Sequence, residues 1–71
     1  MKIGDKVIVK NQHMACFNGK TGMIVAECIP NSQLHMLMGI VMWKVKFDEP
    51  FDAGYGAVTE WEFSEGSLML N

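Results

Sequence analysis

The sequence predicts an all-β fold built from five short strands. Apolar and polar residues alternate over 41–47 and 58–63, as they do in half-buried strands. Shorter runs of β-forming residues cover 4–10, 22–28 and 68–70. Glycine, proline, asparagine or serine lies between each run and the next, so turns separate the strands. Five strands with this spacing indicate a small barrel that is closed or nearly closed.

The first half of the chain is organised around a turn at Asn18-Gly19, because glycine tolerates positive φ and delivers the chain into the strand over 22–28. Before the turn, Val7 and Val9 share one face of the first strand, and Phe17 is expected to fold back onto the core. In the strand after the turn, alternation predicts two faces. The inward residues are Ile24, Ala26 and Cys28, and the outward residues are Met23, Val25 and Glu27.

The second half begins after Pro30, which ends the second strand because proline lacks the ladder N–H. A methionine-rich excursion then leads to the strand over 41–47. Residues 48–56 are expected to form a loop, and the strand over 58–63 follows. The apolar faces of all five strands define the expected core. Its members are Val7, Val9, Ile24, Ala26, Trp43, Val45, Phe47, Trp61, Phe63 and Leu68.

Length and composition narrow the class of protein. The 71 residues predict a single domain over 1–71, and the 49% apolar content provides a core. The formal net charge is −2 and there is no arginine, which disfavours direct nucleic-acid binding. Neither a secretory signal nor an apolar run long enough for a membrane span is apparent, and the two cysteines are too few for a disulfide scaffold. We therefore expect a cytoplasmic protein with reduced thiols and no membrane partner.

The order of these motifs resembles the SH3-like barrels over nearly the whole chain. The first strand, 4–9, looks like theirs, and 19–25 is similar to the Gly-x-x-Gly-x-hydrophobic turn of KOW motifs. The stretch 43–47 and the ending from Trp61 to Leu68 are also similar to that family. A similar order of strand and turn motifs occurs in the small stromal photosystem I subunit and the ferredoxin–thioredoxin reductase variable chain. These resemblances imply an accessory subunit that binds a larger protein. The KOW-like relatives imply binding to RNA, a ribosome or a polymerase.

Side chains suited to chemistry are few and loosely spaced. His13, Cys16, Cys28 and His35 are ligand types for structural zinc, but the tight cysteine knuckle of such sites is missing. Pairing of one cysteine with a histidine also lacks an orienting third group. We therefore expect no enzymatic activity, no metal and no cofactor.

An apolar surface provides the leading functional hypothesis. Exposed apolar patches mark protein–protein contacts, and flexible methionines suit adaptable ones. The candidate partner-binding residues are Leu34, Met36, Leu37, Met38, Met42, Met23 and Val25. They predict docking on a larger protein or complex, or self-association. Burial of the excursion over an open barrel end is an equally weighted alternative.

A KOW-like nucleic-acid- or ribonucleoprotein-binding factor is the second hypothesis. Its candidate residues are Lys6, Lys10, Lys20, Lys44 and Lys46. Glu60 and Glu62 point outward from the next long strand, so antiparallel pairing would set both acids beside Lys44 and Lys46. Such neutralisation disfavours a phosphate-binding face.

Overall fold

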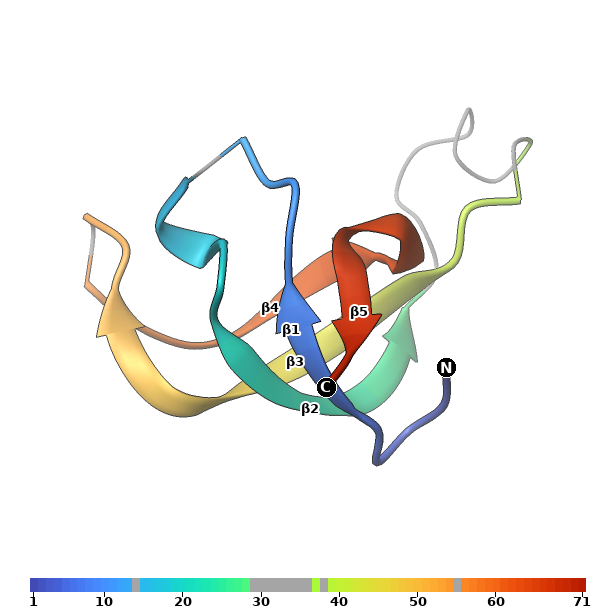
Figure 1. Cartoon of the computed structure of the whole chain (residues 1–71), viewed down its shortest axis with the longest axis horizontal. Coiled ribbons are helices and arrows are strands. Elements are labelled where there is room, and N and C mark those ends of the chain that lie inside the picture. The colour runs from blue at the N-terminus through green and yellow to red at the C-terminus, as the bar shows by residue number, and fades with distance from the viewer. Residues whose placement is uncertain (14, 29–36, 38, 55) are drawn as a thin grey trace.

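One antiparallel sheet contains all five strands of the computed structural model, which describes residues 1–13, 15–28, 37, 39–54 and 56–71 (Figure 1). The strands are β1 (Lys6–Val9), β2 (Thr21–Cys28), β3 (Met42–Asp52), β4 (Ala57–Ser64) and β5 (Leu68–Leu70). Short 3-10 turns, η1 (Ala15–Phe17) and η2 (Glu65–Ser67), precede β2 and β5. The predicted all-β class is confirmed.

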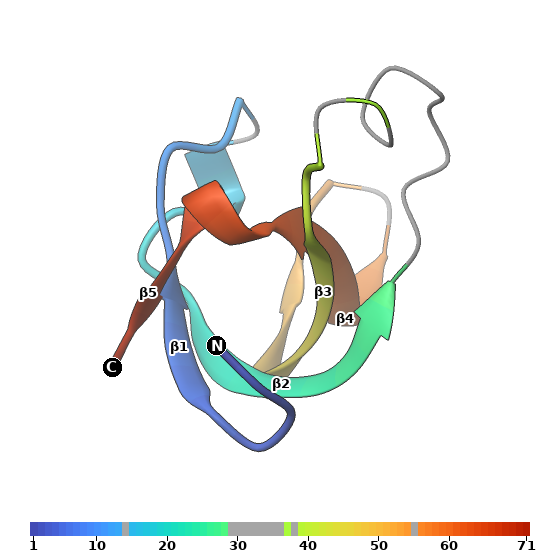
Figure 2. The same ribbon diagram turned by 90° about the vertical axis from the view of Figure 1, so that its right-hand side faces the viewer.

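The strand order is β4-β3-β2-β1-β5, so every strand except β5 lies beside its neighbour in sequence. Figure 2 shows the sheet curving around an interior, with η2 carrying the chain from β4 across to β5. Among the described residues no strand pairing joins β4 to β5, and the sheet is open. β4 and β5 are therefore its two edges.

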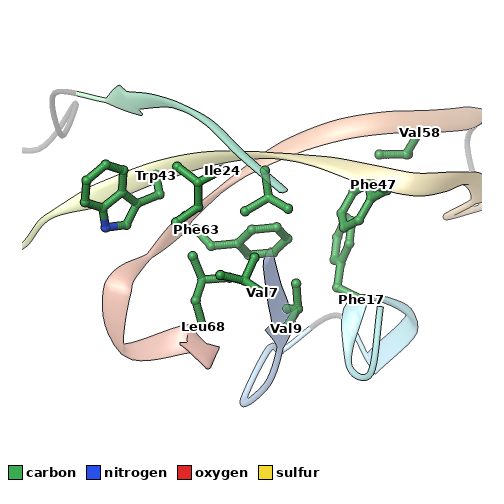
Figure 3. Close-up of a cluster of buried hydrophobic side chains, with 10 residues drawn as sticks. Val7, Val9, Phe17, Ile24, Trp43, Phe47, Val58, Phe63 and Leu68 are labelled. Carbon is green, nitrogen blue, oxygen red and sulfur yellow. The ribbon is translucent and has the colours of Figure 1, made fainter. Parts of the chain in front are cut away.

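The core lies on the inner face of this curved sheet (Figure 3). Burial confirms eight of the ten expected core residues and adds Phe17 and Val58. The buried set is Val7, Val9, Phe17, Ile24, Trp43, Val45, Phe47, Val58, Phe63 and Leu68. Phe17 folds back from η1 as predicted, and its ring lies 5.2–6.1 Å from the rings of four other aromatic residues. One residue of a 3-10 turn thus fills one end of the core.

The expected burial of Ala26 is wrong. The β2–β3 register shifts between Ile24 and Ala26, so Ile24 lies opposite Val45 whereas Ala26 lies opposite Lys44. An extra residue in one strand reverses which face each later side chain takes. Ala26 and Cys28 consequently join the outer face, and both are only half-buried.

Two expectations about the second half are also wrong. Trp61 lies opposite buried Val45, as its inward assignment requires, yet it remains 40% exposed because β4 is an edge strand. Residues 48–52 belong to β3 and not to a loop. Pro50 falls in the register shift between Lys46 and Phe51, where no ladder partner is assigned. The β3–β4 ladder therefore needs no hydrogen bond from this position, where proline has no N–H to donate.

Two glycines satisfy local geometric requirements. Gly19 has φ of 82°, as the predicted turn requires, and its N–H donates to the Val9 carbonyl at 2.8 Å. Gly22 lies inside β2, where an added Cβ would stand within hard contact of the Lys46 carbonyl oxygen and 2.8 Å from a Val45 methyl group. β2 can therefore approach β3 this closely only with glycine at this position.

Candidate interaction surfaces

The strand registers arrange the outer face of the sheet in rows. One row runs from β1 to β4 through Lys6, Met23, Lys46 and Glu60. The next row contains Ala26, Lys44 and Glu62, and a third contains Cys28, Met42 and Ser64. Lysines occupy β1 and β3 in the first two rows, whereas β4 contributes Glu60 and Glu62 there and Ser64 to the third row.

The predicted partner-binding residues are only partly described. Leu34, Met36 and Met38 lie outside the described residues. Leu37 is 84% exposed, the largest exposed fraction among the large apolar side chains that the structure describes. Met23, Val25 and Met42 are half-buried. Met23 and Met42 occupy separate rows with Lys44 between them, so they do not form one contiguous apolar strip.

The predicted lysines do not form one uniform basic face. Lys6 and Lys46 flank Met23, and Lys10 is exposed beyond the end of β1. Lys20 lies instead at the aromatic end, with its Nζ 4.8 Å from the centre of the Phe51 ring. At that distance the ammonium and the ring attract one another.

Glutamates of β4 stand beside two of these lysines. The expected antiparallel placement of these acids beside the lysines is confirmed, because Lys44 lies opposite Glu62 and Lys46 opposite Glu60. The ion pair itself runs diagonally, from Lys44 Nζ to Glu60 Oε1 at 4.0 Å. Both side chains remain well exposed, so this pair contributes little to stability, but it lowers the positive potential of β3.

Three open hollows lie on the described surface, and one of them, of about 320 Å³, lies between residues 39–41 and 64–66. The other two adjoin the edge of β4 and the turn before β2. The hollow at the β4 edge, of about 410 Å³, is lined by Met42, Lys44 and residues 60–62. The hollow at the turn, of about 340 Å³, lies between that turn and the irregular part of β3. In this last hollow the Thr21 hydroxyl donates to Asp48 Oδ2 at 2.7 Å. All three hollows are surface depressions with mixed polar and apolar walls.

The cysteines and histidines are dispersed. His13 and Cys16 are exposed at the end near η1, Cys28 ends β2, and His35 lies outside the described residues. Within the described part of the chain, no three histidine, cysteine or acidic side chains gather as metal ligands would. Partial burial, followed by the negative charge of Glu62, raises the pKa of the Cys28 thiol. A raised pKa keeps this thiol protonated and makes it a weaker nucleophile at neutral pH.

The sequence did not single out several exposed apolar side chains. Ile3 is 62% exposed, Leu70 is 60% exposed and Met69 is 50% exposed. Met69 and Leu70 were assigned to a strand, but their exposure follows from the position of β5 at a sheet edge. Strand order depends on contacts distant in sequence, so local alternation contains no signal for it.

No protein-family model matches this sequence, and searches of curated proteins and of solved structures find no match either. Within the described residues, no helix is both long and apolar enough to cross a membrane.

Proposed function

We propose that the chain is a cytoplasmic, non-enzymatic interaction module with an SH3-like barrel fold, which docks as an accessory subunit on a larger protein. The strand order supports the fold, because β5 returns to β1 and extends the meander formed by β1 to β4. The 3-10 turn between β4 and β5 and the strong curvature of the sheet support it further (Figure 2).

The proposed docking surface is the segment 34–42 together with Met23 and Val25. The exposure of Leu37, at 84%, is the observation that carries this proposal. A leucine this exposed gains free energy when a partner removes it from water, about 2 kcal/mol for full burial. The neighbouring residues of segment 34–42 are rich in methionine and leucine, whose side chains adapt to irregular partner surfaces.

A pull-down from source-cell extract, read by mass spectrometry with and without nuclease, tests this function. Leu37→Asp should lose the captured proteins, and Met36→Asp with Met38→Asp should have the same effect. Leu70→Asp is the matched control, because Leu70 is also an exposed leucine but lies on β5.

Three outcomes separate the hypotheses. Proteins that survive nuclease, are lost with Leu37→Asp and are retained with Leu70→Asp support the proposal. Capture that disappears with nuclease and weakens with Lys44→Glu and Lys46→Glu supports the KOW-like alternative. Capture that none of these variants changes overturns both proposed surfaces.

A further inference from the structure

We propose that the open edge of β4 binds an extended peptide segment of a protein partner as an additional strand. The segment it selects has lysine or arginine alternating with apolar side chains. This surface meets segment 34–42 only at Met42, and its backbone groups belong to β4, so the inference goes beyond the docking function proposed above.

The hydrogen-bonding pattern shows which backbone groups β4 offers. Met42 lies opposite Ser64, so the same register sets Val41 opposite Glu65. The Glu65 N–H donates to the Val41 carbonyl at 2.9 Å, which identifies this as a hydrogen-bonded pair. In an antiparallel ladder such pairs alternate with non-hydrogen-bonded pairs. The alternation therefore assigns the direction of every backbone group in this part of β4.

Three residues of β4, namely Glu60, Glu62 and Ser64, consequently point their backbone groups away from β3. Phe63 and Trp61 direct N–H and C=O toward β3, whereas these three residues direct theirs toward the open edge. Among the residues the structure describes, β3 is the only strand that pairs with β4. All of residues 59–62 are exposed, which leaves this edge accessible on both faces. Such an edge can pair with an incoming strand.

Charge determines which strand fits. Side chains of an added strand would lie directly beside Glu60 and Glu62 on the outer face, and Lys44 and Lys46 would be one strand farther away. Opposite charges on neighbouring strands attract, so basic residues are preferred at these positions. A second copy pairing through its own β4 would instead bring glutamates together, which like-charge repulsion opposes.

The faces beside the edge favour alternation between basic and apolar residues. On the inner face, Trp61 lies between the two glutamates in sequence and contacts Phe17, with ring centres 5.2 Å apart. An apolar side chain of the added strand would extend this aromatic contact. On the outer face, the hollow of about 410 Å³ beside Met42 and Lys44 provides room for the aliphatic part of a long basic side chain.

Two synthetic peptides test the selectivity. Acetyl-Thr-Lys-Val-Lys-Val-Lys-Thr-amide is the basic probe, and the same peptide with glutamate in place of lysine is its control. The basic peptide should bind about tenfold more tightly at low ionic strength, with the difference shrinking as salt is added. Amide NMR shifts should change most at Glu60 and Glu62.

Protein variants distinguish three contributions to peptide binding: the charge of β4, its outward backbone N–H groups, and segment 34–42. Glu60→Lys should weaken binding of the basic peptide about fivefold, and Glu27→Lys, a matched charge change at an exposed β2 position, should not. Glu62→Pro removes an outward N–H while sparing the β3 ladder, so it should weaken binding more than Glu62→Gln. Leu37→Asp should leave peptide binding unchanged, because that residue belongs to the separately proposed surface.

Equal binding of the two peptides would overturn the proposal. So would shifts centred away from β4, or binding to Glu62→Pro as tight as to Glu62→Gln. Circular dichroism and thermal unfolding of each variant confirm that a loss of binding comes from a folded protein. None of these results depends on whether the segment 34–42 proves to be a docking surface.

Discussion

The two edges of the sheet are protected from unwanted strand pairing in different ways. β5 has three residues and no charged side chain, and the N–H of its first residue, Leu68, donates to the Glu65 carbonyl. β4 has eight residues and carries Glu60 and Glu62 on its outer face. Short length limits pairing with any strand, whereas charge limits pairing only with strands of like charge. The comparison indicates that β5 resists pairing with any further strand, whereas β4 resists pairing only with acidic strands.

Truncation of Phe17 should destabilise β4 more than β5, and this is the largest effect that we expect. Phe17→Ala removes a fully buried ring that contacts Trp61 and Phe63 of β4, and it should lower the free energy of unfolding by about 4 kcal/mol. Chemical denaturation measures this loss, with Met69→Ala on exposed β5 as the control that changes little. Hydrogen exchange should accelerate more in β4 than in β5. Equal acceleration at both edges would show that the aromatic cluster does not distinguish them.

A substitution at Gly22 tests the close packing of β2 against β3, two of the strands that lie between the edges of the sheet. Gly22→Ala would force its Cβ into the Lys46 carbonyl oxygen, and it should cost about 3 kcal/mol because backbone must move. Gly66→Ala is the control, since a Cβ there meets nothing within 4 Å. Denaturant unfolding of both variants, followed by tryptophan fluorescence and by circular dichroism, gives the two losses of stability. A stability of Gly22→Ala equal to that of Gly66→Ala would contradict the close approach of β2 to β3.

The smallest effect that we expect is a change in the reactivity of the Cys28 thiol, which lies on the outer face near Glu62 of β4. Glu62→Gln removes the carboxylate charge that raises the pKa of the Cys28 thiol, so the pKa should fall and alkylation by iodoacetamide at pH 8 should accelerate. The measurement uses a Cys16→Ser background, and Glu27→Gln is its control. An unchanged rate would show that Glu62 does not act on Cys28 from β4.

The same shift determines the sign of a pH effect. Because the folded state raises the Cys28 pKa above its ordinary value of 9.0, it retains the thiol proton longer than the unfolded chain. This contribution to stability is present below pH 9 and is lost as the pH rises through the folded pKa. Cys28→Ser should therefore weaken the alkaline loss of stability.

Local pattern in the sequence was sufficient to predict five strands and most of the core, but not the extension of β3 over residues 48–52. Val7 and Val9, and likewise Trp43, Val45 and Phe47, alternate within a few residues, and a half-buried strand requires that periodicity whatever its neighbours. The Asn18-Gly19 turn was predictable for a similar reason, since positive φ at Gly19 is a property of one residue. The placement of the β4 glutamates beside Lys44 and Lys46 followed from antiparallel pairing of two adjacent alternating segments.

Only the tertiary structure decided which strands are edges and where alternation breaks. The register shift after Ile24 turns Ala26 and Cys28 outward, and it arises between β2 and β3, which are separated in sequence. Trp61 has the sequence signature of a core residue, but it stays exposed because no strand covers β4 among the described residues. Selectivity at that edge likewise depends on which backbone groups face outward. Pairing between distant strands sets that direction, and local periodicity contains no information about it.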